Sequence, residues 1–250
     1  MSEIGTMAWA AAGGGLMSRA DRMRQLVQAA GVRGSLRVDR FRPGPTPVQV
    51  DPESIVIPDS MIARQAVDLC REHSSPALAN HCLRTFWWGS LLARSADLRF
   101  DAELFWVAAL LHDLGLTERF GFTSDELHCF AYEGALAAER FCADHGWSDG
   151  RARTVGEAIC LHLNITVPVE AGVEAHLVRS GSGLDVIGTG LGRIHPDNRA
   201  DVLARYPRLG FTEEIGRLVA EQRRRRPGSR MSFLVRNGLG AMIRRGPLTD

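Results

Sequence analysis

A histidine and an aspartate stand side by side at the end of an apolar stretch, in the segment AALLHDLG at residues 108–115. These residues are His112 and Asp113, and imidazole and carboxylate are groups that bind zinc, iron and manganese ions. His81 and Asp185 carry the same two groups far away along the chain. An HD dipeptide alone also arises by chance, so a metal site here requires the fold to bring all four residues together.

The segments that must position these residues have the pattern of helices. Apolar residues recur at helical spacing from about residue 55 onward, and Ser60 and Asp101 stand where helix caps are expected. No segment shows the alternation typical of strands, so we predict an all-α protein. The expected helices lie within 57–73, 76–96, 101–115, 124–146, 150–164, 174–188 and 212–226.

The first 50 residues differ from the rest. They contain the flexible spacer AAAGGG, one short helical segment in SRADRMRQLVQAAG, and the proline-rich RFRPGPTPVQVDP, which crosses into the next part of the chain. We therefore expect a partly ordered N-terminal extension over residues 1–50 and one enzyme domain over residues 51–250.

Composition gives no indication of a nucleic-acid or membrane partner. The formal net charge is +1, and no apolar run approaches the roughly 20 residues that span a bilayer. All basic residues are arginines, which excludes a Schiff-base lysine, and the arginines at 223–226 are expected to be solvated at a helix end. The five cysteines form no C-x-x-C pair, so we expect a cytoplasmic protein.

Several segments occur in an order that resembles a known family. They are REHSSPALANHCLRTFWWGSLLA, ALLHDLGLTERF, FAYEGALAAERF, AICLHLNI, SGSGLDVIG and RYPRLGF. With the H…HD…D pattern they resemble the HD superfamily of metal-dependent hydrolases, and its cyanamide hydratase branch in particular. The resemblance covers roughly residues 55–225 and implies an HD-domain helical bundle.

The resemblance also implies the metal ligands. His81, His112, Asp113 and Asp185 correspond to the family's ligand positions, around one divalent ion for which zinc is the first expectation and Fe(II) or Mn the alternatives. HD enzymes with two metals have two further histidines between the HD pair and the last aspartate. The branch shows an F-x-x-x-G pattern there instead, at Phe130 to Gly134, which favours one metal.

His162 matches the A-I-x-x-H segment of the branch. We expect it to lie beside the metal and to transfer protons, with the free oxygen of Asp113 as a second base; a packed helix histidine is the other interpretation. The resemblance implies that an activated water hydrates cyanamide, a small nitrile, to urea. A homodimer is compatible with the alanine-rich helical faces but is not required by them.

Three alternative functions remain open. A phosphohydrolase acting on nucleotides or phosphoesters would gather basic groups around the metal, and Arg84, Arg119, Arg179 and Arg193 are the candidates. An HD-type iron oxygenase would need two metals and more than four ligands. A non-catalytic module with the same fold would bind metal without turning over any substrate.

Overall fold

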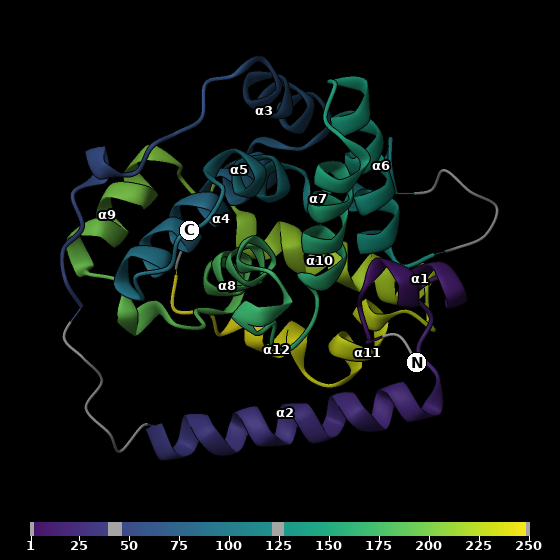
Figure 1. Ribbon diagram of the computed structural model, residues 1–250. Coiled ribbons are helices and arrows are strands. Elements are labelled where there is room, and N and C mark those ends of the chain that lie inside the picture. The colour runs from purple at the N-terminus through teal and green to yellow at the C-terminus, as the bar shows by residue number, and fades with distance from the viewer. Residues whose placement is uncertain (1–2, 40–46, 122–127, 249–250) are drawn as a thin grey trace.

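The protein is described by a computed structural model that covers residues 3–39, 47–121 and 128–248. These residues form α-helices and short 3-10 turns and contain no β-strand (Figure 1), which confirms the all-α prediction. The helices are α1 (Met7–Gly13), α2 (Arg19–Asp39), α3 (Met61–His73), α4 (Pro76–Ser95), α5 (Ala102–Leu111), α6 (Phe130–Asp144), α7 (Asp149–Leu161), α8 (Val173–Ile187), α9 (Pro196–Arg205), α10 (Phe211–Arg225), α11 (Arg230–Arg236) and α12 (Leu239–Arg244).

Helices α4 and α5 form the centre of the molecule. Nearly every residue from Ala77 to Ala93 in α4 is buried, and so is every residue from Leu104 to Leu111 in α5. A helix that is apolar on all sides must be surrounded by other elements. Accordingly α3, α8, α9 and α10 pack against α4, and α7 and α8 pack against α5.

The capping residues begin the helices where the sequence predicts. Ser60 caps α3, Ser75 precedes Pro76 in the first turn of α4, and the Asp101 side chain accepts a hydrogen bond from the backbone N–H of Leu104 in α5. The predicted start of the next helix at Ser124 and Asp125 lies outside the described residues.

Helix α5 ends earlier than the sequence predicts. The prediction extends this helix to Gly115, whereas the structure ends it at Leu111, with His112 as the C-cap and a 3-10 turn over Leu114–Leu116. Gly115 lies so close to the carbonyl oxygen of Phe130 that a Cβ atom at this position would overlap it. The chain therefore turns at the HD pair and packs tightly against the start of α6.

Helices α4 and α8 approach each other through a glycine. A Cβ atom on Gly181 would overlap the carbonyl oxygen of Thr85 and would lie 3.1 Å from the backbone nitrogen of Gly89. Only a glycine at position 181 permits so close an approach of the two helices. The close approach places Asp185 of α8 against the polar residues of α4.

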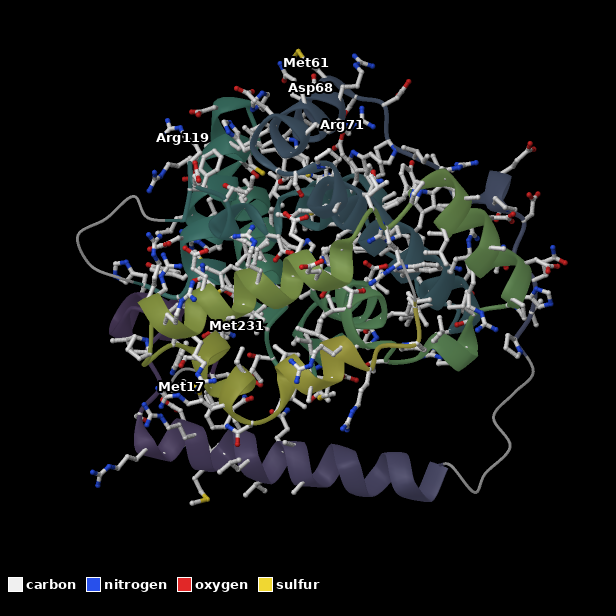
Figure 2. All side chains as sticks on the ribbon, turned by 180° about the vertical axis from the view of Figure 1, so that it is seen from behind. Met17, Met61, Asp68, Arg71, Arg119 and Met231 are labelled. Carbon is white, nitrogen blue, oxygen red and sulfur yellow. The ribbon has the colours of Figure 1, made fainter. Side chains whose placement is uncertain are left out.

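The N-terminal residues are integrated into the domain. The Asn164 side chain donates to the carbonyl of Ile4, the backbone N–H of Cys129 donates to Gly14, and that of Met17 donates to Gly228. Figure 2 shows Met17 and Met231 on the two segments that meet there. Helix α2 is also longer than the predicted short helix, while the boundary between residues 50 and 51 stays a prediction.

The arginine run at 223–226 is only partly solvated. Arg223, Arg224 and Arg225 are exposed as expected, but Arg226 is buried and forms an ion pair with Glu133. The expectation was wrong for Arg226, because the buried carboxylate compensates its charge. In the described parts of the chain, no helix is both long and apolar enough to cross a membrane.

Candidate metal centre

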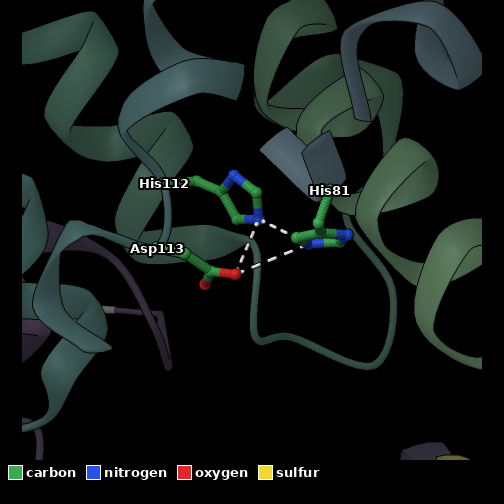
Figure 3. Close-up of side chains that lie close together, drawn as sticks. All are labelled: His81, His112 and Asp113. Atoms are coloured by element: carbon green, nitrogen blue, oxygen red, sulfur yellow. Dashed lines mark hydrogen bonds and ion pairs between the residues drawn. The ribbon is translucent and has the colours of Figure 1, made fainter. Parts of the chain in front are cut away.

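Three of the four predicted ligands meet in the interior (Figure 3). His81 comes from α4, and His112 and Asp113 follow the end of α5. The Nε2 atoms of His81 and His112 are 3.2 Å apart, and Asp113 Oδ2 is 3.5 Å from the first and 3.3 Å from the second. All three residues are buried, with at most 5% of their surface exposed.

The hydrogen bonds of His81 and His112 leave the Nε2 lone pairs of both rings facing each other. His81 Nδ1 lies 2.8 Å from a carboxylate oxygen of Asp185, and His112 Nδ1 lies 2.8 Å from the carbonyl oxygen of Ala109. Both oxygens can only accept, so each ring carries its proton on Nδ1 and each Nε2 is an acceptor. Two such nitrogens and a carboxylate oxygen converge, and this donor set fits a divalent cation.

The charges around the cluster favour the protonation states that bind metal. Burial lowers the pKa of His112 below its usual value, which favours the neutral imidazole. Burial by itself would raise the pKa of Asp113, but His112 and His81 lower it more, so this carboxyl stays ionised. Neutral imidazole and ionised carboxylate are the forms that ligate cations.

Asp185 lies at the other edge of the His81 ring. Its Oδ2 contacts His81 Nδ1, whereas His112 and Asp113 face His81 Nε2. Among the described residues, the group of ligand atoms within 4.8 Å of one another contains His81, His112 and Asp113 and does not include Asp185. The assignment of Asp185 as a fourth ligand stays a prediction.

His162 lies beside the cluster, at the C-terminal end of α7. Its Nε2 is 3.8 Å from Asp113 Oδ1, and its ring meets the His112 ring edge-on with centroids 5.1 Å apart. Its Nδ1 donates to the carbonyl of Ile159 at 2.5 Å, so its Nε2 is also an acceptor. Burial lowers the pKa of His162 to about 3, which keeps the ring neutral.

Three residues around His81 and Asp185 were not singled out from the sequence as part of the site. The Phe211 ring stacks on His81 with centroids 4.4 Å apart and an interplanar angle of 14°. Trp88 donates to Asp185 Oδ1, and Arg208 donates to the backbone carbonyl of Asp185. Trp88 lies two turns after His81 on the same helix, which is a detectable signal. Arg208 and Phe211 belong to the segment RYPRLGF, which carries part of the family resemblance, but their contacts with Asp185 and His81 follow only from the fold.

Comparison with known families identifies the region that contains this centre. Residues 78–179 match the family model of the HD domain. This part of the chain is similar to HD domains. It contains His81, His112, Asp113 and His162, whereas Asp185 lies just beyond the matched residues.

A longer part of the chain is similar to two yeast proteins. Cyanamide hydratase DDI2 and cyanamide hydratase DDI3 of Saccharomyces cerevisiae are each 26% identical to the chain over 181 residues. The similarity covers 71% of this chain and 79% of each relative. Together, the HD domain and these relatives support a metal-dependent enzyme of the HD superfamily.

Proposed function

We propose that this protein is a metal-dependent hydratase that adds water to a small C–N compound, and that cyanamide, hydrated to urea, is its substrate. The observation that carries the proposal is the convergence of His81 Nε2, His112 Nε2 and Asp113 Oδ2 inside the HD domain. The similarity to two cyanamide hydratases supports the choice of substrate.

His81, His112 and Asp113 would hold the ion, with Asp185 as the predicted fourth ligand. We propose one Zn²⁺ per chain, with Fe(II) and Mn as alternatives. A divalent cation held there would supply the Lewis acidity that makes water nucleophilic near neutral pH. Asp113 presents Oδ2 to the two histidines and Oδ1 to His162. One carboxylate can therefore bind the ion and also accept a hydrogen bond on the side of His162.

We propose that His162 accepts a proton during the reaction, because the negative charge of Asp113 opposes the lowering of its pKa by burial. Its Nε2 lone pair points towards Asp113 Oδ1, and its Nδ1–H is fixed to the carbonyl of Ile159. Hydration of a nitrile removes a proton from water and adds one to the nitrile nitrogen, so a neutral imidazole within reach could accept the first and return the second. No covalent nucleophile is needed for this addition.

The positions of the four candidate arginines weigh against the phosphohydrolase alternative. Arg84 is fully buried in an ion pair with Asp185, and Arg179 donates to the backbone carbonyls of Asn164 and Ile165. Arg193 is exposed, and so is Arg119, which lies at the surface in Figure 2. The four guanidinium groups therefore do not gather around the HD pair.

The test is urea formation from cyanamide by purified protein reconstituted with Zn²⁺ or Fe²⁺. We expect turnover in the wild type and in the control His195→Asn, which changes a remote histidine and preserves a capping side chain on α9. We expect His162→Gln to retain its metal and to lose about 10²- to 10⁴-fold in kcat. Full metal occupancy without urea would reject cyanamide as the substrate and leave the metal centre standing.

A further inference from the structure

Helix α2 buries polar residues and exposes apolar ones, the reverse of a helix that packs on a domain through its apolar face. It runs as a long rod along one edge of the molecule (Figure 1). Asp21 and Gln25 are buried, with 8% and 5% of their surface exposed. Met23, Leu26 and Val27 are 62%, 42% and 66% exposed. The large apolar side chains in the first turns of α2 therefore lie mostly in solvent.

Polar residues determine which side of α2 faces the domain. Ser18 and Asp21 form reciprocal hydrogen bonds at the start of the helix, from the backbone N–H of Ser18 to Asp21 Oδ2 and from the backbone N–H of Asp21 to Ser18 Oγ. Further along, Gln28 Nε2 donates to the hydroxyl of Thr166 at 2.6 Å. Since these contacts hold the polar side of the helix against the domain, the opposite, apolar side is turned outward.

Helix α2 has little intrinsic stability. Its 21 residues include two glycines, three valines and a serine, which are weak helix formers. The stability of a helix in a protein comes mainly from the packing of its apolar face, and an isolated helix in water is marginal. In α2 that face is exposed. A second polypeptide that covers it would supply the missing burial.

The exposed apolar residues have the spacing of a coiled coil. Ala20, Met23, Val27 and Ala30 are all exposed and stand at intervals of three, four and three residues. These are the a and d positions of successive heptads, which form a narrow seam that packs against one other helix. A lipid surface favours a wider apolar face with a larger separation from the polar residues. The two alanines also permit the axis of a second helix to come close.

The residues that flank this seam are basic. Arg19 and Arg24 stand on its two sides and are exposed, and Arg22 adds a third exposed arginine to the same turns. Arg24 Nη1 lies 3.9 Å from Asp21 Oδ1, a long and exposed ion pair that leaves most of the arginine charge available. From Arg19 to Gly31 no carboxylate is exposed. The face therefore attracts an acidic partner and repels the same face of a second copy.

We propose that α2 is a docking site for an amphipathic helix of another protein, in which acidic residues flank an apolar seam. Docking would bury Met23 and Val27 in the seam and would pair carboxylates of the partner with Arg19 and Arg24. The site lies outside residues 78–179, which match the HD domain. The proposal is therefore independent of the metal centre and of the reaction proposed for it.

Two synthetic peptides of about four heptads test the sign of the charge. Both have alanine and leucine along the a and d seam, with glutamate at the flanking e and g positions in one peptide and lysine in the other. Fluorescence anisotropy of the labelled peptides with the full-length protein measures binding. We expect the glutamate peptide to bind at least about 10-fold more tightly at low ionic strength, and this difference to shrink in about 1 M salt. Equal affinity for the two peptides, or no binding of either, would contradict the proposal.

Charge-matched variants locate the binding. Arg19→Glu combined with Arg24→Glu should reverse the preference, so that the lysine peptide binds more tightly. Arg223→Glu combined with Arg224→Glu makes the same change in net charge at exposed residues of α10 and should keep the preference for the glutamate peptide. Equal effects of the two double variants would show that the net charge of the protein, and not α2, selects the peptide.

A second pair of variants tests the seam. Met23→Gln combined with Val27→Gln should weaken binding of the glutamate peptide about 10- to 100-fold, because it removes apolar surface from the contact without changing the charge. Met242→Gln, at a methionine of α12 that is 45% exposed, is the control and should leave the affinity unchanged. Unchanged affinity in the seam variant, with the circular dichroism of the wild type, would overturn the site.

Two further results would overturn the choice of partner. A wild-type dimer in analytical ultracentrifugation that Met23→Gln with Val27→Gln converts to a monomer would mean that a second copy covers the face. Co-sedimentation of the wild type with phosphatidylserine vesicles that the same variant abolishes would mean that the face binds a lipid surface.

Discussion

Replacing Gly181 by alanine should separate α4 from α8 and lower the stability of the protein. The added Cβ would overlap the carbonyl oxygen of Thr85 and approach the backbone nitrogen of Gly89 to 3.1 Å. Both neighbours are backbone atoms of a buried helix, so neither can move aside as a flexible side chain would. The two helices must shift instead, and the shift would carry Asp185 away from His81.

The magnitude follows from two opposing effects. Overpacking a well-packed interior costs about 1–3 kcal/mol, and contacts with backbone atoms place this site at the upper end. Alanine is favoured over glycine within a helix by about 1 kcal/mol. The free energy of unfolding should therefore fall by about 2 kcal/mol.

Urea denaturation of Gly181→Ala against Gly216→Ala measures this effect. Gly216 lies within α10, and a Cβ atom added there would meet no described atom of another element within 4 Å. Its alanine variant should therefore gain about 0.5–1 kcal/mol from helix propensity alone. If Gly181→Ala is as stable as the wild type, the close approach of α4 and α8 is not what holds Asp185 against His81.

Three further predictions concern stability. Leu209 has a positive φ of 56°, which strains a residue with a Cβ atom, and its side chain is 59% exposed. Leu209→Gly should therefore raise the free energy of unfolding by about 0.5–1 kcal/mol in urea titrations, and a loss of stability would contradict this. Burial raises the pKa of Glu133 from 4.5 to about 7, so the folded state binds this proton more tightly than the unfolded chain does. The contribution of Glu133 to stability therefore falls as the pH rises from about 4.5 to about 7. When the free energy of unfolding is measured from about pH 4 to 8, Glu133→Gln should remove this fall in stability. An unchanged slope of the free energy of unfolding against pH would argue against a raised pKa of Glu133. Deleting residues 1–18 should cost at least about 2 kcal/mol, because the Asn164 amide and the Cys129 backbone N–H lose their partners; unchanged stability would show that this segment is dispensable.

Much of the fold could be predicted from local signals. Apolar spacing and the caps at Ser60 and Asp101 place the long helices, because burial and capping act within one segment. The short helices α1, α11 and α12 lack the apolar periodicity of the long helices, since fewer than two turns carry little periodicity. Their positions depend on contacts with distant residues.

The ligands of the site were easier to predict than their geometry. The types and order of His81, His112 and Asp113 are visible in the sequence, and the structure brings them together. The contacts of Asp185 with His81, Arg84 and Arg208 could not be predicted, because they follow from the packing of α4 against α8. The burial of Arg226 likewise depends on Glu133, a partner far away in the sequence.

Elemental analysis of purified protein, together with its His112→Ala variant, tests the central claim most directly. We expect one divalent ion per chain in the wild type and in the control His195→Asn, and none in His112→Ala, which removes one of the three converging ligand atoms. A His112→Ala variant with the metal content of the wild type would contradict the claim that these side chains hold the ion.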